Sequence, residues 1–551
     1  MNDPARFHLL LCAGGCCLSS GMASVRTALA AALAAHGLAE QVRVTATGCM
    51  GLCAQGPLLV VNPDGVCYCR LQAADMAELV RGHLVGGQVV ERLLCPDPLT
   101  GAPVRALGDL DFYRRQRKVV LRNCGVVDPA SLAEYEGRGG YQALRQALGK
   151  MTPAQVVEEV SHSGLRGRGG AGFPTGLKWA AVAKEPATPK YVVGNADEGD
   201  PGAFMDRSLL EGDPYSLIEA MTICGYAVGA RQGYVYVRAE YPLAIERLEA
   251  AVATALAAGR LGPDIFGSGF GFTMAVRTGA GAFVCGEETA LLHSIEGRRG
   301  EPHPKPPFPT AKGLFDQPTV LNNVETFANV PYILRHGAEQ YRALGTRQSP
   351  GTKIFALAGN VVNNGLVEVP MGMSLREIVF DIGGGIPGGK MFKAVQIGGA
   401  AGGCLPIEQL DTPVTYEALP KAGAMMGSGG LLVLDEDTCM VDLARYFLEF
   451  LQEESCGKCT PCRLGIKAMR DILERICGGE GEEGDIGKLE LLSDYLAQSA
   501  LCGLGQAAPN NLLSTLRHFR VEYEEHIRRK HCRAGVCPAL APARAAGEEA
   551  R

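Results

Sequence analysis

The chain has 551 residues, of which 47% are hydrophobic and 20% are charged, and its formal net charge is -6. Because this length exceeds what one hydrophobic core usually organises, we expect three or more domains. The near-balanced charge argues against a nucleic-acid partner, and no apolar run reaches the roughly 18–20 residues that a membrane span requires.

Residues 1–90 are predicted to form a thioredoxin-like domain. Apolar runs at residues 7–11, 42–45, 58–61 and 66–70 are typical of strands, and residues 25–35 and 74–84 are typical of helices. The first run precedes Cys12 and resembles a short signal segment, but a basic leading region is missing. We therefore expect a folded strand there.

Residues 91–115 are rich in proline and are predicted to form a linker. Residues 116–345 alternate helical patterns with β runs at 191–193, 233–237 and 272–277, which predicts a Rossmann-like α/β core. The fold class is therefore α/β and multidomain.

Residues 346–435 switch to short strands around one helix at 374–380, an order that is typical of a β-grasp module. Residues 436–525 are predicted to form a helical bundle, with Asp437 as the first N-cap. Residues 526–551 are predicted to be a C-terminal tail.

Twenty cysteines are present, and several fall in tight groups. Such grouping is typical of metal ligands in a reducing compartment, which favours a cytoplasmic location. The clearest motif is Cys456-Gly-Lys-Cys459-Thr-Pro-Cys462, followed at a distance by Cys502. Three closely spaced thiolates and one remote thiolate predict a 4Fe-4S cluster, with a zinc site or a structural loop as alternatives.

A second group near the N-terminus pairs Cys12 and Cys17 with Cys49 and Cys53. Both pairs directly follow predicted strands, where loops converge. Four thiolates in two pairs predict a 2Fe-2S cluster. Cys16 competes with Cys17 for the second position, and a zinc site or a redox disulfide are alternatives.

Residues 163–179 form a glycine-rich loop that leads toward a helix and ends near Lys178. Glycines let main-chain N–H groups approach phosphate oxygens, and a lysine adds a point charge. Acidic groups follow two predicted strands, at Asp197-Glu198-Gly-Asp200 and at Glu287-Glu288. Carboxylates at strand ends accept hydrogen bonds from ribose hydroxyls and repel a 2′-phosphate. A flexible loop and solvated loop ends are the alternatives.

Six motifs occur in order: residues 164–179, residues 195–206, residues 279–288, Lys305-Pro-Pro-Phe308-Pro, Leu321-Asn322-Asn323-Val-Glu325-Thr and the CxxCxxC sequence. Over about residues 1–540 the chain resembles the NADH-binding flavoprotein subunit of complex I and its relatives. Those relatives include the diaphorase subunits of NAD-linked hydrogenases and formate dehydrogenases.

The resemblance implies an FMN site and an NAD(H) site. The residues implied for FMN are Gly167, Arg168, Gly169, Gly170, Lys178, Asn195, Asp197, Glu198, Gly286, Glu287, Asn322 and Asn323. Those implied for the dinucleotide are Phe173, Asp200, Glu288 and Phe308. Hydride transfer between NAD(H) and FMN would connect to single-electron transfer through the clusters.

The resemblance also favours a type of complex. Complex I members usually carry Glu where this chain has Asp200. This difference and the fused N-terminal domain favour a soluble hydrogenase- or formate-dehydrogenase-type complex. Its catalytic subunit, a small 2Fe-2S subunit or a ferredoxin would be the partners. A complex I-like or ferredoxin-linked NADH dehydrogenase subunit and a non-catalytic scaffold are the alternatives.

Many hydrogenase relatives continue into a C-terminal ferredoxin domain, whose contribution we expect to be absent or supplied by another subunit. His526, Cys532 and Cys537 instead offer zinc ligands, with Cys439 as a fourth. Reduced thiols in a fraying tail are the alternative.

Overall fold

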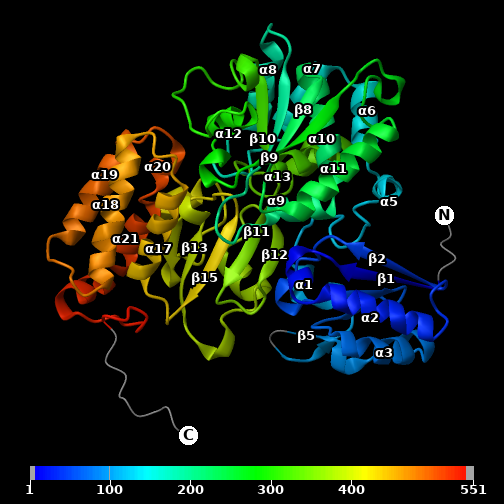
Figure 1. Cartoon of the computed structure of the whole chain (residues 1–551), viewed down its shortest axis with the longest axis horizontal. Helices are drawn as coiled ribbons and strands as arrows, with labels where there is room; N and C mark the ends of the chain where they lie inside the picture. The colour runs from blue at the N-terminus through cyan, green and yellow to red at the C-terminus, as the bar shows by residue number, and fades with distance from the viewer. Residues whose placement is uncertain (1–5, 98–99, 541–551) are drawn as a thin grey trace.

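A mixed four-stranded sheet organises the N-terminal domain of the computed structural model, which describes residues 6–97 and 100–540 (Figure 1, blue). The sheet order is β2 (Val42–Thr47), β1 (Phe7–Cys12), β3 (Leu59–Asn62) and β4 (Val66–Tyr68). β1 is parallel to β2 and antiparallel to β3. Its helices are α1 (Gly15–Ser19), α2 (Met22–Ala35) and α3 (Met76–Leu79), the last continued by a π-helical turn (Val80–Val85). This arrangement confirms the thioredoxin-like prediction.

Part of the predicted linker instead extends this sheet. Leu94 pairs with Tyr68 of β4, and a hairpin of β5 (Cys95–Pro96) and β6 (Pro103–Val104) follows. The reason is that β4 would otherwise leave an edge of unpaired main-chain groups. After α4 (Asp111–Arg114), the Arg117 amide donates to the Glu368 carbonyl of the β-grasp module at 2.9 Å.

A parallel four-stranded sheet lies at the centre of the α/β core. Its order is β10 (Thr319–Asn323), β7 (Tyr191–Ala196), β8 (Gln232–Arg238) and β9 (Thr273–Gly279). The helices of this part are α5 (Leu132–Gly137), α6 (Gln142–Lys150), α7 (Pro153–His162), α8 (Thr175–Lys184), α9 (Met205–Gly212), α10 (Pro214–Val228), α11 (Pro242–Ala257), α12 (Glu288–Ile295), α13 (Val324–Ala328), α14 (Val330–His336) and α15 (Ala338–Arg342). The predicted α/β core is confirmed, although β10 was not predicted as a strand.

The strand order reverses beside β7. The chain passes from β7 to β8 and β9 on one side, and then returns to place β10 on the other side. Asn195 near the end of β7 and Asn323 at the end of β10 are register partners. Because the loops leaving such neighbouring strands diverge, a crevice for a ligand is expected at their carboxyl ends.

The β-grasp module follows, in green to yellow (Figure 1). Its sheet order is β12 (Gly365–Pro370), β11 (Thr352–Gly359), β15 (Gly430–Asp435), β13 (Phe392–Ile397) and β14 (Gly403–Pro406). A π-helix (Glu377–Ile382) overlaps the helix predicted at residues 374–380, and α16 (Ala418–Ala422) precedes β15. Its apolar core is continuous with that of the N-terminal domain, and the Leu366 amide donates to the Gly51 carbonyl at 2.8 Å.

The C-terminal part is helical, as predicted: α17 (Met440–Glu454), α18 (Thr460–Cys477), α19 (Asp485–Ser499), α20 (Gly503–Ala507), α21 (Asn510–Glu524) and a π-helical turn (Glu525–Arg529). α17 is capped by Cys439 and not by Asp437, because the Cys439 thiol accepts from the Asp442 amide. Residues 541–551 of the predicted tail lie outside the described residues.

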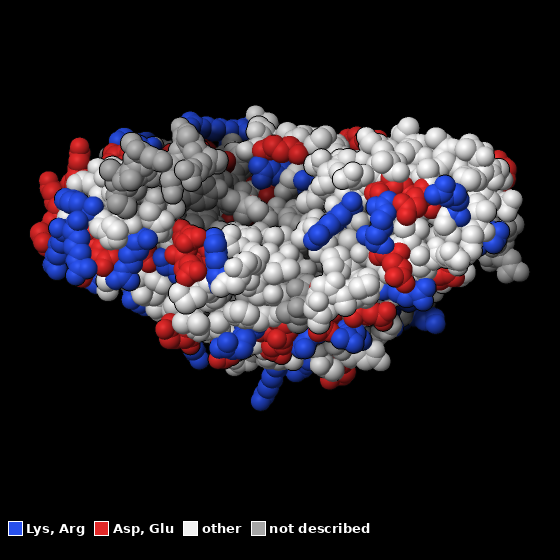
Figure 2. Space-filling view, turned by 90° about the horizontal axis from the view of Figure 1, so that it is seen from below, with Lys and Arg blue, Asp and Glu red and all other residues white. Residues whose placement is uncertain are grey.

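Basic and acidic side chains are interspersed over the face seen in Figure 2, in keeping with the small net charge. Within residues 6–97 and 100–540, every helix is too short or too polar to cross a membrane.

Candidate functional site

A cavity of about 580 Å³ opens where β7 and β10 end. This volume lies in the range of roughly 300–1,000 Å³ that is usual for small-molecule sites. The predicted residues that line it are Gly169, Gly170, Asn195, Asp197, Glu198, Asp200, Gly286, Glu287 and Asn323. The structure thus brings together parts of the glycine-rich loop, both acidic groups and the second asparagine motif.

Asp197 is the most exceptional side chain of this cavity. It is 2% exposed, and neither carboxylate oxygen has a hydrogen-bond partner among the described residues. Burial raises its pKa to about 8, against the lowering effect of Arg238. Burial also raises the pKa of Glu198 to about 7. A buried polar group without a partner is rare in folded proteins, so Asp197 points to a ligand that supplies one.

The glycine-rich loop cradles the cavity with its main chain. A Cβ added to Gly169 would lie 2.9 Å from the Cβ of Asn323, and Gly170 has a φ of 135°, which disfavours any side chain. The Asn323 side chain itself accepts from the Thr326 amide and caps α13. The cradle therefore requires glycine at these positions.

Three predicted FMN ligands differ from the expectation. The Arg168 side chain is fully buried and donates to the carbonyls of Thr352 and Pro350, so it braces the loop from behind. The amide oxygen of Asn322 accepts from Trp179 at 3.0 Å. Gly167 accepts from the Tyr416 hydroxyl through its carbonyl and does not line the cavity. All three residues therefore form hydrogen bonds with residues that do not line the cavity.

Charged and aromatic side chains lie near the cavity without lining it. Glu288 is 3.4 Å from the Lys178 amine and 2.7 Å from the Lys305 amine, and the two lysines help to hold its pKa below the usual range despite burial. Phe173 and Phe308 are 53% and 56% exposed, which leaves their rings free to stack. Glu288, Phe173 and Phe308 were predicted to contact a dinucleotide, whereas Lys178 was predicted to bind FMN and also does not line the cavity.

Asp200, predicted to contact the nicotinamide end, lines the cavity but is also engaged by the β-grasp module. It accepts from the Ser428 hydroxyl at 2.5 Å and from the Ala400 amide at 3.2 Å. Burial raises its pKa. The carboxylate therefore joins the α/β core to the β-grasp module at the cavity wall.

All four cysteines of the predicted 4Fe-4S motif line one small cavity. Cys459 and Cys502 occupy the positions directly before the first residues of α18 and α20. Val284 and Leu504 line both this cavity and the larger one. The two sites therefore share a wall of apolar side chains.

The N-terminal cysteines also converge. Hydrogen bonds from the thiols of Cys17 and Cys49 lower the pKa of Cys12, and the Cys49 and Cys53 sulfurs are 4.0 Å apart. Cys16 is exposed, and the Cys53 thiol, helped by the Arg207 cation, lowers its pKa to about 7. Five thiols therefore meet where four are needed, so Cys17 as the second ligand stays a prediction.

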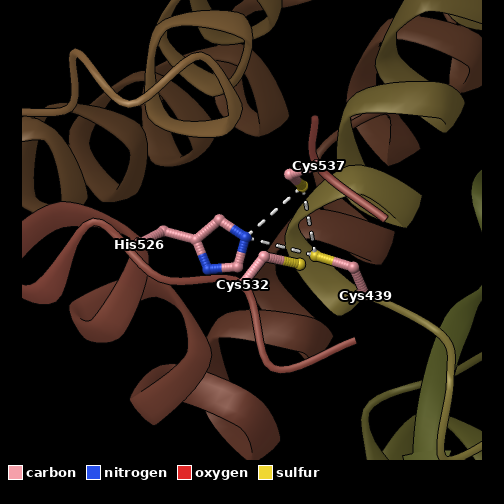
Figure 3. A group of neighbouring side chains, drawn as sticks. All are labelled: Cys439, His526, Cys532 and Cys537. Atoms are coloured by element: carbon pink, nitrogen blue, oxygen red, sulfur yellow. Dashed lines mark hydrogen bonds between the residues drawn. The ribbon is translucent and has the colours of Figure 1, made fainter. Parts of the chain in front are cut away.

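Another group of possible metal ligands lies in the helical domain (Figure 3). The ligand atoms of Cys439, His526, Cys532 and Cys537 all lie within 4.8 Å of one another, and all four residues are buried. The Cys439 sulfur is 3.8 Å from that of Cys537 and 3.4 Å from His526 Nε2. The structure thus brings the four predicted zinc ligands together from both ends of the domain.

Comparisons with known proteins agree with this geometry. Residues 160–332 match the Nuo51 FMN-binding domain, and residues 442–526 match the NADH-ubiquinone oxidoreductase-F iron-sulfur binding region. The chain is 56% identical over 427 residues to the HndC subunit of the NADP-reducing hydrogenase of Solidesulfovibrio fructosivorans, covering 78% of this chain and 87% of that protein.

The chain belongs to the family of NADH-binding flavoprotein subunits. Another member, the F 2 subunit of the NADH-quinone oxidoreductase of Rhizobium meliloti (strain 1021), is 49% identical and covers 75% of this chain and 98% of its own. A chain of an NAD+-reducing [NiFe]-hydrogenase in the H2-reduced state matches with a TM-score of 0.67 and 31% identity, covering 96% of this chain and 85% of that chain.

The family's two matched regions coincide with two of the sites. The FMN-binding region contains β7 and β10, and the iron–sulfur region contains the four clustered cysteines at the beginnings of α18 and α20. The partnerless Asp197 carboxylate and the glycine cradle fit FMN, which has both ribityl hydroxyls and a phosphate to offer. This flavoprotein is therefore an oxidoreductase subunit with FMN- and 4Fe-4S-binding domains.

Several residues of the cavity were not predicted. Asp206, which accepts from the Glu325 amide, lines the cavity, as do Gly398, Gly427 and Ser428 of the β-grasp module. The helical domain adds Gln506 and Asn510. Glycine pairs near residues 398 and 427 were the signal available in the sequence, but nothing local showed that they approach β7.

Proposed function

We propose that this chain is the NAD(H)-reactive subunit of a hydrogenase-type complex, which passes electrons between the dinucleotide and partner subunits. One observation carries the choice of complex: in the same sequence comparison, the NADP-reducing hydrogenase subunit is 56% identical to this chain, whereas the NADH-quinone oxidoreductase F 2 subunit is 49% identical. Formate-dehydrogenase-type and complex I-type assemblies are the competing proposals.

FMN, when bound, exchanges two electrons with a nicotinamide and single electrons with iron–sulfur clusters. The glycine cradle and Lys178 would hold its phosphate, and Asn195 and Asn323 would orient it at the ends of β7 and β10. Asp197, with a pKa of about 8, keeps a proton on its carboxyl near neutral pH and can donate a hydrogen bond to the flavin. Phe173 and Phe308 would stack on the dinucleotide.

Val284 and Leu504 separate the FMN cavity from the 4Fe-4S cavity. Their apolar side chains exclude water from the shared wall, so the two carriers would be held close without an open path for solvent. We propose that Cys456, Cys459, Cys462 and Cys502 hold the 4Fe-4S cluster. Cys12, Cys17, Cys49 and Cys53 are proposed to hold a 2Fe-2S cluster.

We also propose that Cys439, His526, Cys532 and Cys537 bind one zinc ion. Zinc–sulfur bonds of about 2.3 Å and zinc–nitrogen bonds of about 2.0–2.1 Å give a tetrahedron with edges of roughly 3.8 Å and 3.5 Å. The Cys439–Cys537 distance is 3.8 Å, and the distances from His526 Nε2 to these two sulfurs are 3.4 Å and 3.5 Å.

The surroundings of His526 support the same proposal. Its Nδ1 is 2.7 Å from the Glu522 carbonyl, which orients the ring and leaves Nε2 for the metal. A disulfide would need sulfurs about 2.05 Å apart. The neighbouring Cys537 thiol and burial raise the pKa of Cys439, so a cation is needed to hold thiolates here.

The test uses the chain purified anaerobically with its cofactors. NADH or NADPH is added stepwise while flavin absorbance is followed, and the reduced sample is measured by EPR. NADH-specific loss of flavin absorbance with two distinct iron–sulfur signals is expected. A protein that holds clusters but neither binds FMN nor responds to either dinucleotide would contradict the proposal and favour a scaffold.

The type of complex needs a second measurement. The tagged chain, isolated anaerobically with its native partners, is assayed for NAD+ reduction by hydrogen and, separately, by formate. Hydrogen-dependent NAD+ reduction is expected. Reduction by formate alone, or neither activity together with quinone reduction, would replace the hydrogenase assignment.

A further inference from the structure

Two segments that carry the N-terminal cysteines, residues 14–17 at the start of α1 and residues 48–53 after β2 (the cysteine loops), lie directly on α9 of the α/β core. A Cβ added to Gly15, which precedes Cys16, would lie 2.0 Å from Nη2 and 2.7 Å from Cζ of Arg207. At the other end of the helix, a Cβ added to Gly48 would lie 2.3 Å from the Cα of Gly212. Glycine at both positions lets the cysteine loops approach α9 without an intervening side chain.

The same helix forms part of the FMN cavity. The amides of Asp206 and Arg207 donate to the two Glu198 carboxylate oxygens at 2.7 Å and 2.9 Å, and Glu198 and Asp206 both line the cavity. Arg207 therefore has its main chain at the wall of the flavin site and its guanidinium against the cysteine loop.

The guanidinium is held in place from the core side. Its Nε donates to Glu211 at 2.8 Å, and its Cζ lies 5.3 Å from the centre of the Tyr241 ring. The side chain of Glu211 is 1% exposed, whereas that of Arg207 is 32% exposed. The Arg207 guanidinium provides all three of the atoms nearest to a Cβ added at Gly15. The cysteine loop therefore meets the positive member of this ion pair.

Resting on the proposed 2Fe-2S site, we propose that Arg207 is a positioning residue that raises the reduction potential of that cluster and seats it against the flavin-binding core. Reduction adds one negative charge to the cluster, and a fixed cation beside the cysteine loop stabilises the reduced form. The potential of such clusters responds to net charge and hydrogen bonds at sulfur.

The principal test is Arg207→Gln in the full chain with its cofactors, measured by EPR-monitored redox titration. We expect the 2Fe-2S midpoint potential to fall by about 59 mV or more, a tenfold change in the one-electron equilibrium. Arg207→Lys should retain most of the potential because the charge remains. The 4Fe-4S potential, read in the same samples, should not move.

Gly15→Ala tests the same contact from the opposite side. The added methyl group displaces the flexible guanidinium, so the 2Fe-2S potential should fall in this variant as well, without removal of the charge from the chain. It also keeps the proposal testable if Arg207→Gln does not fold. Gly108→Ala, whose added Cβ meets no atom within 4 Å, is the glycine control.

Arg260→Gln is the charge control, because Arg260 also forms an ion pair, with Glu136 at 2.7 Å, and its side chain is partly exposed. An unchanged 2Fe-2S potential in Arg207→Gln or in Gly15→Ala, with the cluster signal intact, would overturn the proposal. An equal shift in Arg260→Gln would also overturn it. Absence of a second iron–sulfur signal in the unmodified protein would instead refute the 2Fe-2S site itself.

Discussion

Replacement of Cys439 by serine isolates the contribution of the proposed zinc ion. Cys439 is the N-cap of α17, and its sulfur accepts from the Asp442 amide. Serine is also a preferred N-cap residue, so the helix start is kept while the thiolate ligand is lost. His526, Cys532 and Cys537 remain, but they are close together in sequence and no longer connect to α17.

The size of the effect follows from the length of the closed loop. Cys439 and Cys537 are separated by 98 residues, whereas His526 and Cys537 are separated by 11. Cross-linking a loop of about 100 residues removes about 4.7 kcal/mol of chain entropy from the unfolded state. Cys439→Ser should therefore lower the free energy of unfolding of the helical domain by about 4–5 kcal/mol.

Zinc content and stability are measured on the same preparations. Elemental analysis should find one zinc ion per unmodified chain and a large loss in Cys439→Ser, and urea unfolding gives the change in free energy. Cys404→Ser is the matched control, because Cys404 is fully buried and its thiol also has a polar partner, Ser514. That control should keep its zinc.

Two results would refute the zinc argument. One is an unmodified chain that contains no zinc and whose stability does not change when a chelator is added. The other is a Cys439→Ser variant that keeps stoichiometric zinc or unfolds at the same urea concentration as the parent protein. Substitution with cobalt gives an independent check, since thiolate ligands produce intense charge-transfer absorption.

Three further substitutions test the FMN cavity and its surroundings. Burial raises the pKa of Asp197 to about 8, above the unfolded value of about 3.9, so the flavin-free protein should lose stability as the pH rises between these values. Asp197→Asn should remove that loss, and parallel stability–pH curves for the two proteins would contradict the assignment. Glu288→Gln removes the negative charge beside Lys178 and Lys305, so kcat/KM for NADPH relative to NADH should rise by about tenfold or more. An unchanged ratio in steady-state assays would argue against a contact between Glu288 and the ribose. Glu325→Gln removes the charged partner of Lys353, whose side chain is 0% exposed. The free energy of unfolding, measured in urea, should fall by about 3–5 kcal/mol. A loss below about 1 kcal/mol would show that the lysine finds another partner.

The hydrogen-bond partners of Arg168 lie far from it in the sequence. Arg168 lies within a loop whose glycines do line the cavity, yet its own guanidinium reaches the Thr352 and Pro350 carbonyls. Nothing in the local sequence distinguishes an arginine that meets a phosphate from one that braces a loop. The difference depends on where residues nearly two hundred positions later lie.

The amino-acid sequence by itself determined the cysteine groups, the order of the domains and the periodicity of the main helices and strands. These features are local, because ligand spacing and hydrophobic repeats are set within a few residues. It also indicated the four residues that we propose as zinc ligands, whose types suit that metal.

The tertiary structure alone decided which groups meet. The reversal of strand order beside β7 placed Asn195 and Asn323 at one crevice, and packing of the β-grasp module brought Ser428 to Asp200. The close approach of Gly15 to Arg207 likewise joins residues that are remote in sequence. Such contacts arise from the packing of whole domains, and no local pattern of residues encodes them.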